Sequence, residues 1–156
     1  VLLGNTELTN YCAKIIADKI KDIDFDYIVV PEAKVLPMVQ SVCTILGDRD
    51  FVVFRKGVKA YMVNPIETSV KSITTLAVQK MVVDGVDADK IRGKKVLLMD
   101  DVVSTGGTFH AMEKLLADLD CKIVGYAAAL REGTDFSSDN LYYIQDLPVF
   151  VGALGE

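Results

Sequence analysis

Apolar and polar positions along the chain follow two spacings, and each spacing predicts a different element. Continuous apolar runs predict strands buried in a parallel sheet, and apolar positions three or four residues apart predict amphipathic helices. The predicted strands lie in 26–34, which ends in a short turn, and at 51–54, 95–99 and 122–130, with a shorter terminal pair at 141–144 and 149–151. The predicted helices cover 6–21, with Thr6 as the cap, 35–46 and 107–118. Because strands alternate with helices, we expect an α/β fold around a parallel sheet.

The size and composition of the chain predict a single domain over residues 1–156. With 156 residues, 51% of them hydrophobic, the chain can bury one sizeable core and no more. The sequence has neither an apolar span of membrane length nor a signal peptide, so we expect no membrane association. The first residue is Val1 rather than methionine, which leaves open whether N-terminal residues are missing. Three cysteines without metal-ligand spacing, Cys12, Cys43 and Cys121, predict reduced thiols and a cytoplasmic location.

One segment, residues 96–108, joins a strand to a helix through a turn whose chemistry suits a sugar phosphate. The strand delivers two adjacent carboxylates, Asp100 and Asp101, to the edge where open α/β sheets bind ligands, and we expect both to face solvent. Vicinal carboxylates can accept hydrogen bonds from two sugar hydroxyls, and they can hold Mg²⁺ directly or through water. The turn offers unobstructed backbone N–H groups at a helix N-terminus, where a phosphate monoester is stabilised. Its members are Ser104, Thr105, Gly106, Gly107 and Thr108.

The same segment lacks the lysine of a Walker A loop, which argues against hydrolysis of nucleoside triphosphates. It resembles the signature with which type I phosphoribosyltransferases bind phosphoribosyl pyrophosphate (PRPP): an aliphatic strand, two acidic residues, two aliphatic residues, a variable residue and Thr-Gly-Gly-Thr. The resemblance implies a parallel sheet with helices on both faces, a flexible lid loop and a small C-terminal hood. It also implies that Asp100 and Asp101 bind the ribose hydroxyls, that 104–108 binds the 5′-phosphate and that Val102 stacks on the base. Without the resemblance, the acidic pair could be a solvated strand end and the turn a plain helix cap.

Two basic segments are candidates for binding the pyrophosphate group of PRPP. A net charge of −5 repels such a polyanion at long range, so cations must be concentrated beside the site. Ala33 and Lys34 lie in a Glu-Ala-Lys turn that resembles the pyrophosphate loop of the family, in which glycine usually stands at the place of Val35. The basic cluster that resembles the purine branch consists of Arg55, Lys56 and Lys59. From the residues alone, Lys34 could be an exposed lysine at a helix start, and the cluster a solvated basic turn.

Three further features have less specific interpretations. The polar segment 64–75 is either a lid over the reacting centre, with Glu67 and Lys71 as candidate contacts, or a twisted surface hairpin. The terminal segment 141–150 is expected in the hood over the base. His110, the single histidine, is expected to be a surface or packing residue because no dyad with a carboxylate is visible around it.

The resemblance implies a purine phosphoribosyltransferase of nucleotide salvage, which transfers the 5-phosphoribosyl group from PRPP to a purine base and releases pyrophosphate. Adenine is favoured, because hypoxanthine-guanine members carry aspartate where Ser104 stands. Xanthine and hypoxanthine stay open as alternatives. The catalytic candidates are Asp100, Asp101, Lys56 and Lys59, with Mg²⁺ as the cofactor. The resemblance also implies a homodimer.

Three alternatives stay open beside this enzyme. The chain could be a PRPP-sensing regulator without catalysis, a phosphoribosyltransferase acting on a pyrimidine such as orotate, or another α/β nucleotide-binding domain. A regulator of this kind usually carries a DNA-binding module, and the chain shows neither room for one nor a basic reading helix, so we expect no nucleic-acid partner. The basic cluster favours an enzyme over a sensor, because departure of pyrophosphate requires cations.

Overall fold

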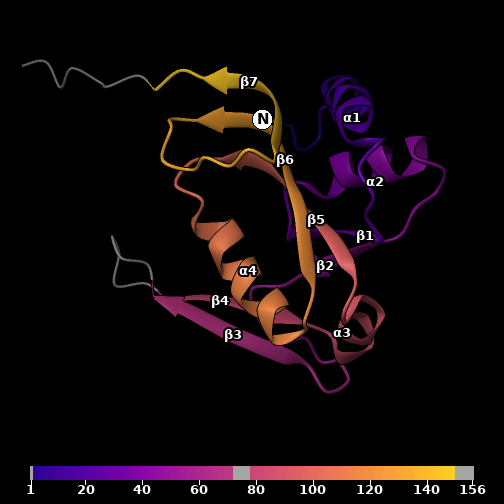
Figure 1. Ribbon diagram of the computed structural model, residues 1–156, viewed down its shortest axis with the longest axis vertical. Helices are drawn as coiled ribbons and strands as arrows, with labels where there is room; N and C mark the ends of the chain where they lie inside the picture. The colour runs from indigo at the N-terminus through magenta and orange to yellow at the C-terminus, as the bar shows by residue number, and fades with distance from the viewer. Residues whose placement is uncertain (1, 72–77, 150–156) are drawn as a thin grey trace, which may run out of the picture.

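A five-stranded parallel sheet forms the centre of the molecule, with a separate antiparallel hairpin beside it (Figure 1). The computed structural model describes residues 2–71 and 78–149. The elements are α1 (Thr6–Ile20), β1 (Tyr27–Pro31), α2 (Leu36–Ile45), β2 (Phe51–Phe54), β3 (Ile66–Lys71), β4 (Val78–Val83), α3 (Gly85–Ile91), β5 (Lys95–Val103), α4 (Gly107–Asp118), β6 (Lys122–Glu132) and β7 (Leu141–Leu147). The sheet order is β2-β1-β5-β6-β7, and every neighbouring pair is parallel.

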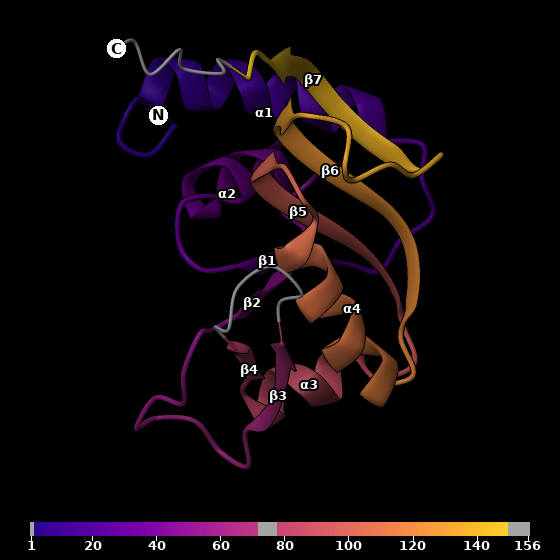
Figure 2. The same ribbon diagram turned by 90° about the vertical axis from the view of Figure 1, so that its left-hand side faces the viewer.

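Helices cover both faces of the sheet, as predicted. On β1, Ile28 and Val30 pack into a core with α1 and α2, whereas Val29 between them packs into a second core with α3, α4 and β4. This division follows from the two-residue period of a strand, which sends successive side chains to opposite faces. Because both faces are buried there, β1, β2 and the first part of β5 are nearly continuously apolar, and this explains the pattern of the sequence. Figure 2 shows α1 and α2 on one side of the sheet and α4 on the other.

Several element boundaries differ from the prediction. Asn5 rather than Thr6 caps α1, because the Asn5 Oδ1 atom accepts a hydrogen bond from the Leu8 N–H at 3.0 Å. β5 does not end at residue 99 but continues to Val103, where it still pairs with β6. The two aspartates therefore lie inside the strand. Helix α3 was not predicted from the pattern, since its seven residues bury only Ala88 and Ile91.

Within segment 64–75 the structure describes one strand, β3, and its hairpin partner β4 lies beyond the segment, so the hairpin interpretation is confirmed for this strand alone. β3 and β4 pair in register from Ile66 opposite Val83 to Lys71 opposite Val78. Glu67 forms an ion pair with Lys80 across the hairpin at 2.9 Å. The remainder of the segment, including Thr74 and Thr75, lies outside the described residues, as does the side chain of Lys71. A role of this hairpin as a lid stays a prediction.

The segment expected in the hood is the edge strand β7 of the main sheet. Its side chains Tyr142 and Ile144 pack against the core under α1, and Asp146 pairs with Arg131 of β6 at 2.7 Å. The expected strand at 149–151 is not formed at Val149, and residues 150 and 151 lie outside the described part. Sequence patterns cannot separate a hood strand from an edge strand, because both bury one face. Among the described helices, none combines the length and apolarity needed to cross a membrane.

Candidate active site

A cavity of about 200 Å³ lies where β5 passes into α4. It brings together most of the residues that the sequence assigned to the sugar and the phosphate. Ser104 and Thr105 are exposed there, and Val102 is half-buried. The lining residues are Gln79, Asp100, Val102, Val103, Ser104, Thr105, Gly106, Gly107, Thr108 and Phe109. Among the candidates of this segment, Asp101 is absent from the lining.

Gly106 is required by the backbone of the turn. Its φ is +81°, in the left-handed region, and it takes the N-cap position of α4. A Cβ atom at this position would lie 2.3 Å from Cδ2 of Phe136. Phe136 is buried and packs its ring 5.3 Å from those of Phe109 and Tyr126. The aromatic ring thus supports the turn from inside the molecule.

Phe136 is a residue that sequence reasoning missed. It lies in the loop between β6 and β7, thirty positions beyond Gly106, and only a single aromatic among polar neighbours could have indicated it. Around it, Glu113 accepts a hydrogen bond from the Tyr126 hydroxyl at 2.6 Å and pairs with His110 at 2.9 Å. Burial and this bond raise the pKa of Tyr126. His110 is exposed and lies beside Phe136, as predicted for a surface or packing residue, but the expectation that no carboxylate partners it is wrong, because Glu113 does.

The two carboxylates are half-buried, so the prediction that both face solvent is wrong. They belong to the part of β5 that still pairs with β6, and this pairing buries part of each side chain. The Asp101 N–H donates to Asp100 Oδ1 at 2.8 Å. Burial, and then the neighbouring Asp101 side chain, raise the pKa of Asp100 to about 7, although this N–H and the positive charge of Lys56 act in the other direction. Asp100 therefore changes its charge near neutral pH.

A second group of candidate residues begins at Glu32, directly after β1. Glu32 Oε2 pairs with the Arg55 guanidinium at 3.0 Å, and Oε1 accepts a hydrogen bond from the Lys56 N–H at 2.8 Å. The Lys56 N–H and the Arg55 guanidinium hold the pKa of Glu32 below its usual value, against the effect of burial. The carboxylate thus ties the turn 32–34 to the basic cluster. Sequence reasoning gave Glu32 no role, since its partners are more than twenty positions away.

The predicted cations lie at this same edge of the sheet. Lys34, Lys56 and Lys59 are exposed, and Arg55 is half-buried through its ion pair. Because β1, β2 and β5 are parallel, their carboxyl ends meet at one edge, and the charge of Lys56 is felt at Asp100. Val35 is fully buried beneath the turn, in the core under α1 and α2. The arrangement can neutralise an anion beside the acidic pair.

The donor set also bears on a divalent cation. The described residues contain no cluster of three or more histidine, cysteine or acidic side chains able to hold a metal by themselves. Carboxylate oxygens are ligands that Mg²⁺ prefers, and it usually completes its shell with water and substrate phosphates. The acidic pair fits Mg²⁺ in this manner.

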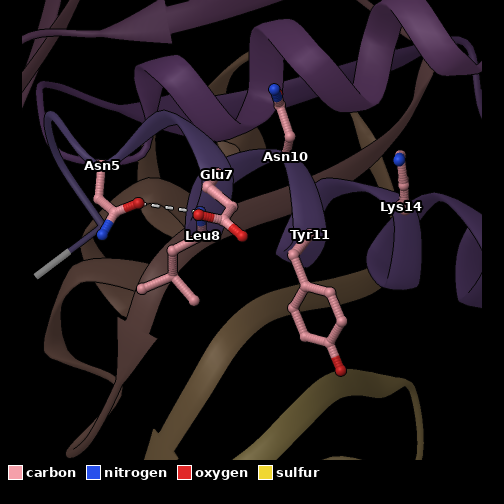
Figure 3. Close-up of a pocket in the computed structure, with 6 residues that line it drawn as sticks. All are labelled: Asn5, Glu7, Leu8, Asn10, Tyr11 and Lys14. Carbon is pink, nitrogen blue, oxygen red and sulfur yellow. Dashed lines mark hydrogen bonds between the residues drawn. The ribbon is translucent and has the colours of Figure 1, made fainter.

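A larger hollow of about 570 Å³ lies on the outer surface of α1, and Figure 3 shows the side chains around it. The hydrogen bond drawn there is the cap between Asn5 and Leu8, and Tyr11 is 61% exposed. The titratable residues among those described around this hollow are Glu7, Tyr11 and Lys14, and no ion pair or side-chain hydrogen bond joins any two of them. We therefore place the candidate site at β5 and α4.

Comparisons with known proteins identify the family to which the chain is similar. Residues 4–151 match the family model described as a phosphoribosyl transferase domain. The chain is 34% identical over 125 residues to adenine phosphoribosyltransferase of Petrotoga mobilis, which covers 80% of this chain and 68% of that protein. It is 32% identical over 132 residues to hypoxanthine/guanine phosphoribosyltransferase of Methanothermococcus okinawensis, which covers 85% of this chain and 67% of that protein. The chain thus spans about two thirds of the length of these relatives.

The fold is likewise similar to a solved structure. Adenine phosphoribosyltransferase from Thermoanaerobacter pseudethanolicus superposes with a TM-score of 0.77 at 20% sequence identity, covering 94% of this chain and 84% of that chain. At this identity the superposition demonstrates the shared fold. The parallel sheet with helices on both faces is therefore confirmed.

Proposed function

The chain belongs to the phosphoribosyltransferase family, and we propose that it transfers the 5-phosphoribosyl group of PRPP to adenine and releases pyrophosphate. One observation carries the proposal: the acidic pair and the glycine turn belong to the end of β5, the basic cluster follows β2 and the turn 32–34 follows β1, and the carboxyl ends of these three parallel strands meet at one edge. These are the groups that a ribose, a 5′-phosphate and a leaving pyrophosphate require. These three groups are parts of one molecule, PRPP, so the arrangement supports a site for this substrate.

We assign the sugar phosphate to the β5–α4 segment. Asp100 and Asp101 accept hydrogen bonds from the ribose hydroxyls, and the turn 104–108 holds the 5′-phosphate with its backbone N–H groups and hydroxyls. The helix dipole of α4 adds a favourable field at the same point. Since this substrate brings a leaving group of its own, the protein needs no nucleophile and acts by holding the reactants in line.

Departure of pyrophosphate depends on the turn 32–34 and the basic cluster. We assign its binding to Ala33, Lys34, Arg55, Lys56 and Lys59. The cations stabilise the negative charge that develops on the leaving group, and one such contact is worth roughly 3 kcal/mol, about a hundredfold in rate. Among these residues, Lys56 and Lys59 are proposed to be catalytic. Asp100 and Asp101 are the proposed catalytic residues on the ribose side. Glu32 holds Arg55 and the backbone of Lys56 in place.

Mg²⁺ is the cofactor that this site fits. Asp100 and Asp101 would hold it directly or through water, and when bound it supplies further neutralisation of the pyrophosphate charge. The carboxylate oxygens support this assignment. The raised pKa of Asp100 implies that metal affinity increases as the pH rises through about 7.

The purine is assigned to the side of Val102, a half-buried residue of the cavity wall that offers an aliphatic surface for stacking. Adenine is favoured by the similarity to adenine phosphoribosyltransferases. Hypoxanthine and guanine are the competing bases, because relatives that act on them match the chain nearly as well. We also propose one domain over 1–156, a homodimer, and a cytoplasmic location, the last supported by three free cysteines among the described residues.

Release of pyrophosphate tests the proposal. The chain, Mg²⁺ and PRPP are incubated separately with adenine, hypoxanthine, guanine, xanthine and orotate, and pyrophosphate is measured in each. We expect release with adenine in excess of the other four. If PRPP raises the melting temperature but no base releases pyrophosphate, the chain is a PRPP sensor rather than an enzyme.

A further inference from the structure

The cavity at the glycine turn has one wall that comes from outside the β5–α4 segment. All other lining residues lie between 100 and 109, whereas Gln79 belongs to strand β4 of the hairpin. Its Oε1 atom lies 3.7 Å from the point that a Cβ atom on Gly107 would occupy. The side-chain amide of Gln79 therefore faces the first turn of α4 across the cavity.

The packing of the hairpin explains this direction. Gln79, Met81 and Val83 are alternate residues of one strand and share a face. Met81 and Val83 are buried in the same core as Phe109 and Met112 of α4. The opposite face carries Lys80, which pairs with Glu67 away from the helix. Two buried anchors thus fix the strand against α4 (Figure 1). Gln79 lies beside Gly107, at the N-terminal end of this helix.

The chemistry of the cavity gives this amide a specific use. Among the described residues that line the cavity, none is lysine or arginine. A phosphate there would depend on backbone N–H groups, hydroxyls and the helix N-terminus, all from one side. A glutamine amide carries two N–H donors and, after rotation about its last bond, can present them to phosphate oxygens. Gln79 would close the remaining side with a neutral donor.

We propose that Gln79 is a further substrate-binding residue, whose side-chain amide donates to the 5′-phosphate and connects the β3–β4 hairpin to the phosphate turn. This inference rests on the proposed function, since it needs a phosphate in that cavity. The amide is specific to the 5′-phosphate: the pyrophosphate is assigned to the basic cluster, which does not line this cavity.

Calorimetric titration with ribose 5-phosphate and, separately, with pyrophosphate tests the inference. The variants are Gln79→Ala, Gln79→Glu and, as the matched control on the opposite face of the same strand, Lys80→Ala. Loss of one hydrogen bond to a charged group predicts a Kd for ribose 5-phosphate raised about tenfold in Gln79→Ala. Gln79→Glu adds a repelling carboxylate and is expected to weaken binding further. The Kd for pyrophosphate is expected to stay unchanged in all three variants.

The outcomes separate this inference from the proposed function. If the unchanged protein binds ribose 5-phosphate and Gln79→Ala binds it within about twofold as well, Gln79 is not a ligand of the phosphate and only the inference is overturned. The inference alone is also overturned if Gln79→Ala raises the Kd values for ribose 5-phosphate and pyrophosphate equally. It is overturned as well if Lys80→Ala raises the Kd for ribose 5-phosphate as much as Gln79→Ala does. If the unchanged protein neither binds ribose 5-phosphate nor releases pyrophosphate, the proposed function itself fails and the inference fails with it.

Discussion

Replacement of Gly106 by alanine tests the support of the phosphate turn by Phe136. Two costs combine at this position: the φ of +81°, and a Cβ atom 2.3 Å from the Phe136 ring. An L-residue in the left-handed region costs roughly 1–2 kcal/mol, and an overpacked buried contact adds about 1–3 kcal/mol. Because Phe136 is only 5% exposed and packs against both Phe109 and Tyr126, its ring has little room to move away.

Gly93 offers a matched control for the first of these costs. Its φ is +70°, yet a Cβ atom there would meet nothing within 4 Å. Gly93→Ala is therefore expected to lower the free energy of unfolding by the backbone cost alone, roughly 1–2 kcal/mol. Each 1 kcal/mol lowers the Tm of a chain of this size by about 2–4 °C. Gly106→Ala is expected to lower it by roughly 2–5 kcal/mol. The difference between the two variants measures the contact with Phe136.

Thermal unfolding and the Kd for ribose 5-phosphate are measured on both variants and on Gly106→Ala combined with Phe136→Ala. We expect Gly106→Ala to raise the Kd for ribose 5-phosphate by at least about tenfold, since a displaced turn no longer aligns its N–H groups. Gly93→Ala should leave this affinity unchanged. The double variant should recover part of the affinity, because the clash is removed while the backbone cost stays. Equal melting temperatures and affinities for Gly106→Ala and Gly93→Ala would refute the reasoning.

Three further predictions follow from the charges of the site. The Asp100 carboxyl has a pKa raised to about 7, so the folded chain binds more protons than the unfolded chain between about pH 4 and 7, and the free energy of unfolding falls as the pH rises through that window. Urea unfolding should show that Asp100→Asn gains stability relative to the unchanged chain over the same interval, and a constant difference would contradict the raised pKa. Glu32→Ala removes two hydrogen bonds and should cost roughly 1–3 kcal/mol of stability and raise the KM for PRPP, whereas Asp18→Ala, which breaks an exposed pair with Lys21, should change neither. Lys56→Ala should slow pyrophosphate release by about a hundredfold, and a rate within threefold of the original would remove Lys56 from catalysis.

The sequence predicted those parts of the site that are contiguous in the chain. Helix α4 begins and ends at the predicted residues, because a glycine turn and an apolar period mark it locally. The extension of β5 through Asp100 and Asp101 was missed, since aspartate is unfavourable in strands and only pairing with β6 places it there. This extension is also why the carboxylates are half-buried rather than exposed.

Contacts between distant positions could not be predicted. Glu32 meets Lys56, Phe136 meets Gly106, and Gln79 reaches the cavity only because Met81 and Val83 dock on α4. None of these pairs leaves a periodic signal, since each depends on the order of strands in the sheet and on the position of the hairpin. The sequence therefore indicates which chemistry is present, and the fold determines which residues position it.

Turnover by the double variant Asp100→Asn with Asp101→Asn tests the central assignment most directly. Pyrophosphate release from PRPP and adenine is measured for this variant and the unchanged chain, with circular dichroism to verify that both are folded. If the acidic pair holds the ribose, release should fall by about a hundredfold or more while the fold is retained. A folded double variant that turns over within about threefold of the unchanged chain would contradict the assignment.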